Sequence, residues 1–90
     1  MSNDGTPGSE LIEEGLADLR SGRETAAALV VSIGAPRLAS LGIEVPDPHQ
    51  DPEHRLYATL ATQFGDAAHS RYNALIRRLV SFERARSCVR

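Results

Sequence analysis

The sequence predicts an all-α protein, a small bundle of four helices plus one short helix with no sheet. Three observations support this fold class. Apolar residues return every three or four positions in several segments. Capping residues, glycines and prolines mark the ends of these segments. The segment 29–33 could also be a strand by periodicity, but nothing else in the chain offers it a partner strand.

Length and composition are those of one globular domain. The chain has 90 residues, of which 41% are hydrophobic and 24% are charged, so it folds around a modest core. We interpret residues 1–8, which are mostly Gly, Pro and small polar residues, as a disordered tail. Residues 9–87 form a single helical domain in this interpretation, and residues 88–90 form a frayed C-terminus.

We expect a cytoplasmic protein that is neither secreted nor inserted in a membrane. Cys88 is the only cysteine, which excludes a disulfide within the chain and a paired-cysteine zinc cluster. The first ten residues lack the basic start and apolar centre of a signal peptide, and the longest apolar run, 26–31, is too short to span a bilayer. All ten basic residues are Arg, which hints at a bacterial genome rich in GC.

The first two helices are predicted from caps and apolar spacing. Ser9 is the expected N-cap of the first helix, with glutamates in the first turns near the positive end of the helix dipole. Its expected buried stripe consists of Ile12, Leu16 and Leu19. The Ser-x-x-Glu motif at 21–24 predicts a capping box for the second helix. Residues 25–33 are apolar on nearly every side, so this helix belongs at the centre of the bundle.

A short helix and a loop follow. Gly34 ends the second helix, and Ala35 and Pro36 begin a short helical segment that residues 41–43 close. The segment 44–52 contains three prolines and is therefore predicted to be the main loop. Its end, Asp51 followed by Pro52, has the pattern of an N-cap and first residue for the third helix.

The last two helices complete the predicted bundle. In the third helix, the expected buried face is Tyr57, Leu60, Ala61 and Phe64. Gly65 ends that helix, and Asp66 caps a fourth helix that runs to about residue 86. The apolar residues of the fourth helix span roughly 160° of its circumference at 100° per residue. They are Tyr72, Leu75, Ile76, Leu79, Val80 and Phe82.

Charge is distributed unevenly along the chain. Residues 1–66 hold four Arg against eleven acids, whereas residues 67–90 hold six Arg against one acid, Glu83. On the fourth helix, Arg77, Arg84 and Asn73 lie opposite the apolar arc. Arg71 and Arg78 follow one flank, and Arg86 falls nearer the apolar side. This arrangement is compatible with a solvated helix face, a nucleic-acid contact or a protein contact.

Nucleic acid is the first functional alternative. Residues 60–75 superficially resemble a helix-turn-helix core, with the fourth helix as its reading helix. That motif requires apolar residues where this chain has Asp66 and Arg71, and burying an unpaired charge costs several kcal/mol. Phosphate binding by the arginines remains possible without the motif.

A protein partner is the second alternative. Glu10, Glu14 and Asp18 follow one another at i, i+4 spacing on the first helix. The helix dipole explains the two glutamates but not Asp18, which lies later in the helix. An acidic stripe on one helix and an arginine stripe on another suit a defined protein partner or a homodimer in which each stripe meets its opposite. Every such contact requires Arg77 and Arg84 to be free of internal ion pairs.

Metal binding and catalysis have weaker support. Residues 47–54 hold His49, His54 and several acids, but proline and capping roles explain much of this loop. His69 is expected to be a partly buried packing residue. The neighbouring His69 and Ser70 point about 100° apart, so they form no nucleophile and base pair. No glycine-rich phosphate loop is present. We therefore expect no catalytic residues, metal or cofactor.

Glu83 lies among the apolar residues of the fourth helix. Either the core has ended there, which would leave Phe82 and Val80 for a partner, or Glu83 meets an arginine. The candidate arginines are Arg20, Arg37 and Arg86. We expect a small interaction or regulatory module that binds an unknown protein or itself through Arg71, Asn73, Arg77, Arg78, Arg84, Glu10, Glu14 and Asp18. The alternative is a nucleic-acid-binding protein that uses the same arginines.

Overall fold

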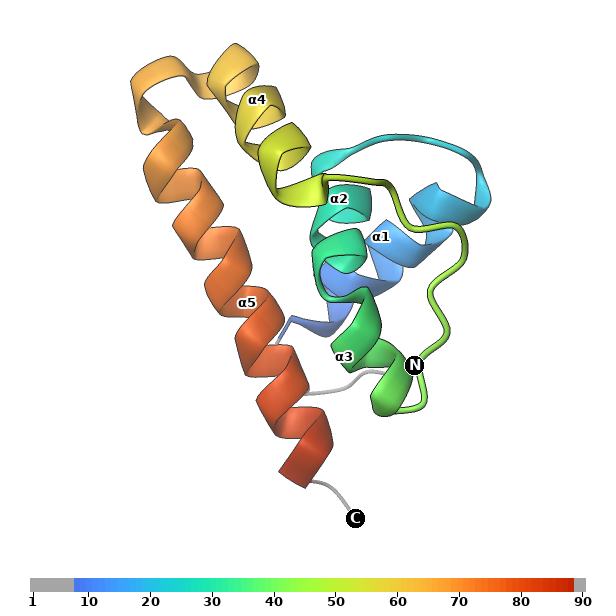
Figure 1. The fold of residues 1–90 in the computed structure, drawn as a ribbon. Coiled ribbons are helices and arrows are strands. Elements are labelled where there is room, and N and C mark those ends of the chain that lie inside the picture. The colour runs from blue at the N-terminus through green and yellow to red at the C-terminus, as the bar shows by residue number, and fades with distance from the viewer. Residues whose placement is uncertain (1–7, 89–90) are drawn as a thin grey trace.

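The computed structural model describes residues 8–88, and this part of the chain contains helices and no strand (Figure 1). This confirms the predicted all-α class. The elements are α1 (Ser9–Arg20), α2 (Ala26–Ile33), α3 (Ala35–Ser40), α4 (Pro52–Phe64), the 3₁₀ turn η1 (Gly65–Ala67) and α5 (Ala68–Cys88). No helix in this range is long and apolar enough to cross a membrane. The predicted tail at 1–7 and the end at 89–90 lie outside the described residues.

The core is built around α2. This helix lies between α1 and the hairpin formed by α4 and α5, and α3 continues from its end (Figure 1). Leu29, Val30 and Val31 of α2 are fully buried, together with Leu38 of α3 and Leu56 of α4. A helix that is apolar on all sides is stable only when neighbours cover it from several directions. The central position predicted for residues 25–33 therefore agrees with the structure.

The contact between α1 and α2 depends on a glycine. A Cβ atom at Gly15 would overlap the Val31 side chain and the backbone of Ala27. The missing side chain thus lets the two helix backbones approach closely. Leu11, Ile12 and Leu19 of α1 are buried, while Leu16 is only partly buried.

Two predicted caps in this region are wrong. The first helical residue of α1 is Ser9 itself, and Gly8 occupies the N-cap position. At α2 the cap is Thr25, whose hydroxyl accepts a hydrogen bond from the Ala28 N–H at 3.1 Å. The predicted capping box at 21–24 therefore does not form. The turn after α1 is longer than a capping box allows, and Thr25 is the oxygen-bearing side chain closest to the first turn of α2.

The loop between α3 and α4 crosses α2. The His49 N–H donates to the Ser32 hydroxyl at 3.0 Å, and that hydroxyl donates to the Ala28 carbonyl at 2.8 Å. Asp51 stands at the N-cap position of α4, as predicted, but its side chain makes no capping hydrogen bond. Its φ angle of 50° is left-handed, whereas a capping side chain needs extended backbone to reach the first turn.

The predicted buried face of α4 is wrong in part. Leu56 and Leu60 are buried, but Tyr57 is 41% exposed, Phe64 is 39% exposed and Ala61 is exposed. The first part of α4 packs on α2, whereas its end extends away from α1 and α3 at the outer end of the hairpin (Figure 1). The i, i+3, i+4, i+7 row is present, but its neighbours within residues 8–88 bury only Leu60 and leave the rest partly covered.

Helix α5 keeps most of its predicted apolar arc. Leu79 and Phe82 are buried, and Tyr72, Leu75 and Ile76 are partly buried against the core. Val80, at the edge of the arc, is 37% exposed. The predicted cap at Asp66 is wrong, because this residue lies inside η1 and α5 begins two residues later at Ala68.

Candidate interaction surface

The arginines of α5 face solvent. Arg77, Arg78 and Arg84 are exposed, and none of them forms an ion pair with any residue of the described range. The single ion pair in that range joins Arg55 and Glu24 at 3.0 Å, between α4 and the turn after α1. The requirement that Arg77 and Arg84 be free of internal ion pairs is met within residues 8–87. We call Arg71, Arg77, Arg78 and Arg84 the arginine face.

Arg71 and Asn73 have partners within the hairpin. The Arg71 guanidinium carbon lies 4.2 Å from the centroid of the Phe64 ring, a cation–π contact that joins the start of α5 to the end of α4. The Asn73 amide nitrogen lies 3.2 Å from Nε2 of His69. His69 is exposed, so the prediction of a partly buried histidine is wrong. Its ring lies beside Tyr57, with centroids 6.4 Å apart, on the uncovered part of the hairpin.

The acidic stripe predicted on α1 is divided by the fold. Glu10 and Glu14 are exposed, as is Glu13 between them, but Asp18 is only 9% exposed. The Asp18 carboxylate accepts a hydrogen bond from the Thr25 hydroxyl at 2.6 Å. Because Thr25 also caps α2, Asp18 serves the turn between the first two helices. The surface acids are then Glu10, Glu13 and Glu14, which we call the acidic start of α1.

The start of α1 lies against the middle of α5. A Cβ atom at Gly8 would stand 2.6 Å from the carbonyl oxygen of Arg78 and 3.3 Å from Cβ of Phe82. Gly8 has a φ angle of 77°, which favours glycine in any case. The chain therefore enters α1 in contact with the backbone of α5, on the flank that carries Arg78 and the buried Phe82. The sequence did not predict this contact, because Gly8 was assigned to the disordered tail.

Glu83 is partly buried and faces away from the arginine face. A Cβ atom at Gly34 would lie 3.1 Å from Oε2 of Glu83 and 2.8 Å from Cδ1 of Leu79. Burial raises the pKa of Glu83, and the positive charge of Arg37 lowers it by a smaller amount. Of the three arginines considered from sequence, Arg37 is the one that acts on Glu83, without an ion pair.

The core continues past Glu83, so one sequence-based alternative is wrong. Phe82 is buried and is not offered to a partner. The Arg86 guanidinium carbon lies 5.9 Å from the centroid of its ring. Val80 remains exposed on the outer side of α5, between Arg77 and Arg84 in sequence.

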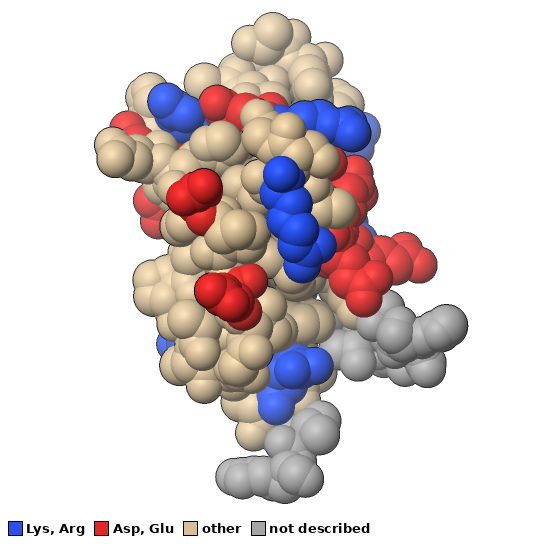
Figure 2. Space-filling view, turned by 90° about the vertical axis from the view of Figure 1, so that its right-hand side faces the viewer, with Lys and Arg blue, Asp and Glu red and all other residues tan. Residues whose placement is uncertain are grey.

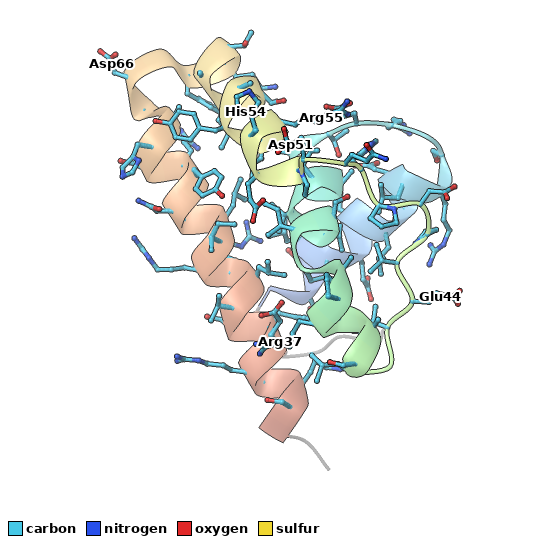
Figure 3. The ribbon with its side chains drawn as sticks, viewed as in Figure 1. Arg37, Glu44, Asp51, His54, Arg55 and Asp66 are labelled. Atoms are coloured by element: carbon cyan, nitrogen blue, oxygen red, sulfur yellow. The ribbon has the colours of Figure 1, made fainter. Side chains whose placement is uncertain are left out.

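The loop that carries two histidines assembles no metal centre in the described part of the chain. No three His, Cys, Asp or Glu side chains there come close enough together to hold an ion. Asp51 and His54 lie near the start of α4, whereas Glu44 stands far away on the other side of the loop (Figure 3). His49 points inward, and its Nε2 is buried without a hydrogen-bond partner.

The face of the molecule on the far side from α5 has mixed charge. Acidic and basic side chains alternate across it, with acidic groups gathered at one edge (Figure 2). A surface of mixed sign produces no strong field of its own. The outer surface of α5 differs from this face in its charge. The sole acid of α5 is Glu83, and it is turned toward Gly34.

Comparison of the chain with protein-family models, with curated protein sequences and with solved structures found no match.

Proposed function

We propose that the chain is a small helical interaction or regulatory module without a catalytic role. It binds a protein, either a foreign partner or a second copy of itself, through the arginine face of α5 and the acidic start of α1. The observation that carries this proposal is the exposure of Arg77, Arg78 and Arg84 without an ion pair in the described range.

Chemistry favours a protein partner for this surface. Arginine is enriched at the centres of protein interfaces, because its planar guanidinium binds carboxylates through two parallel hydrogen bonds. The glutamates at the start of α1 repel phosphate groups and attract basic side chains. A protein that presents both signs of charge suits a protein partner that also carries both signs.

Nucleic acid is the second candidate, supported by the absence of outward-facing acids on α5 between residues 68 and 87. Asp66 and Arg71 are both exposed, so neither occupies the buried position that a helix-turn-helix requires. Contact with phosphates alone would weaken about tenfold or more between 50 and 200 mM salt for three contacts. Fluorescence anisotropy with a labelled duplex measures this dependence.

Affinity capture tests the choice between these partners. Tagged wild-type protein and the Arg77→Glu, Arg84→Glu double variant are incubated with lysate, both with and without prior nuclease treatment. The matched control is Arg20→Glu with Arg23→Glu, which changes the same charge at exposed positions away from the arginine face. We expect a protein that the wild type and the control retain and the α5 variant loses. Equal retention by all three, or binding that nuclease abolishes, overturns the proposal.

A further inference from the structure

We infer that the outer end of the α4–α5 hairpin binds the guanidinium group of an arginine that a partner protein presents. The site combines three aromatic rings with one carboxylate. It consists of Glu53, Tyr57, His69 and Tyr72, which we call the tyrosine site. None of these residues belongs to the arginine face, so the inference goes beyond the proposed function and does not depend on it.

Three aromatic rings meet where α4 and α5 lie side by side. The centroid of the Tyr57 ring, on α4, lies 5.8 Å from that of Tyr72 and 6.4 Å from that of His69, both on α5. The ring planes are tilted by 50° and 59°, so neither contact is a parallel stack. Tyr57 is 41% exposed, and its ring therefore has surface open to a ligand. The face of an aromatic ring is negative and attracts cations.

A carboxylate completes the tyrosine site. Glu53 precedes Tyr57 by four residues on α4, so the two side chains lie on the same side of that helix, one turn apart. Its charge also reaches α5, where burial and, to a smaller extent, Glu53 raise the pKa of the Tyr72 phenol. Glu53 is exposed and forms no ion pair with any residue that the structure describes. The rings therefore adjoin a negative charge that a partner's cation can balance.

Other rings of the same protein indicate which cation suits the site. The guanidinium carbon of Arg71 lies 4.2 Å from the centroid of the Phe64 ring, and that of Arg86 lies 5.9 Å from the centroid of Phe82. Within the described range, neither tyrosine has an arginine over its ring. A guanidinium is planar and weakly hydrated, stacks on aromatic rings and binds a carboxylate through two parallel hydrogen bonds. Rings beside Glu53 therefore favour an arginine over the strongly hydrated ammonium group of lysine.

An NMR titration of purified protein with short peptides tests the inference. The chain has 2 tyrosines and both belong to the site, so the tyrosine ring protons report on it directly. The probe is a capped glycine–arginine–glycine peptide, and its matched control carries citrulline, which resembles arginine in shape but has no charge. We expect saturable shifts with a dissociation constant on the order of millimolar for the single arginine. The citrulline and lysine versions should bind at least about fivefold more weakly.

Variants of the protein locate the binding. Glu53→Gln removes the charge and keeps the shape of the side chain, so the affinity for the arginine peptide should fall about threefold or more at low salt. Tyr57→Leu removes the exposed ring and should weaken binding about fivefold, which the remaining Tyr72 signals measure. The matched control is Glu44→Gln, which removes an exposed acid in the loop away from α4 and should leave the affinity unchanged (Figure 3). Circular dichroism confirms that the variants remain helical.

Three results overturn the inference. The first is equal binding of the arginine peptide and either of the other two peptides. The second is an affinity that both Glu53→Gln and Tyr57→Leu leave unchanged. The third is the absence of saturable shifts at arginine peptide concentrations up to about 50 mM. None of these results bears on the arginine face, because the capture experiment with the Arg77 and Arg84 variant tests the proposed function separately.

Discussion

The centre of the bundle and the outer end of the α4–α5 hairpin both carry large apolar side chains but bury them to opposite degrees. Leu29, Val30 and Val31 are fully buried, whereas Tyr57 and Phe64 are exposed. Neighbouring helices cover α2 on several sides, whereas within residues 8–88 the end of α4 has η1 and α5 beside it (Figure 1). Helical spacing shows which residues share a face, while the number of covering neighbours decides whether that face is buried.

Truncating the central core should produce the largest effect. Leu29→Ala removes part of a fully buried side chain from α2 and leaves a cavity. We expect the free energy of unfolding to fall by about 2–5 kcal/mol. For a domain of this size, that is a large fraction of the total stability. Urea denaturation followed by circular dichroism measures it. A loss below about 1 kcal/mol would contradict the central position of α2.

A substitution in the turn between α1 and α2 should have an intermediate effect on the free energy of unfolding. Asp18→Ala removes the acceptor of the Thr25 hydroxyl and should lower the free energy of unfolding by about 2 kcal/mol, the range for hydrogen bonds to charged groups. The matched control, Glu14→Ala on the exposed side of the same helix, should change it by less than about 0.5 kcal/mol. Equal effects of the two substitutions would place Asp18 on the surface.

Truncating the outer end of the hairpin should have a smaller effect. Phe64→Ala removes an exposed ring that lies against the Arg71 guanidinium. We expect a loss of about 0.5–1 kcal/mol, the range for an exposed cation–π pair. The same urea measurement applies. A loss as large as that of Leu29→Ala would show that another surface covers the ring in solution.

The pH dependence of Glu83 should be the smallest effect. Because burial raises its pKa, the folded state holds this proton more tightly than the unfolded chain does. The contribution of Glu83 to the free energy of unfolding should therefore decrease as pH rises from about 4.5, the ordinary pKa of glutamate, through the raised value. Glu83→Gln should make this decrease shallower, and Arg37→Gln should make it steeper, in urea titrations across the acidic range. Unchanged slopes in both variants would contradict the prediction.

Prediction from sequence succeeded where local chemistry alone decides the structure. The helix starts near Ser9 and Pro52, the short helix at Ala35 and the central position of residues 25–33 all follow from backbone preferences and apolar patterning. Caps were harder to predict. Thr25 replaced the expected motif at 21–24, since several nearby side chains bear a suitable oxygen and the exact path of the turn selects one.

The candidate surface was predicted in part. The exposure of Arg77 and Arg84 follows from their positions opposite the apolar arc, and the structure leaves them there. Asp18 has the same spacing as Glu10 and Glu14, so sequence gave no reason to separate it from them. Its hydrogen bond with Thr25, seven residues away and beyond a turn, distinguishes it from the two glutamates.

The helices, their apolar sides and the arginines on the outer side of α5 follow from the order of residues, because they depend on spacing within one helix. The packing of the helices settles which apolar rows are covered, which acid turns inward and where α1 begins against α5, at Arg78. These features depend on contacts between residues far apart in the chain, and helical periodicity carries no information about which face another helix will meet.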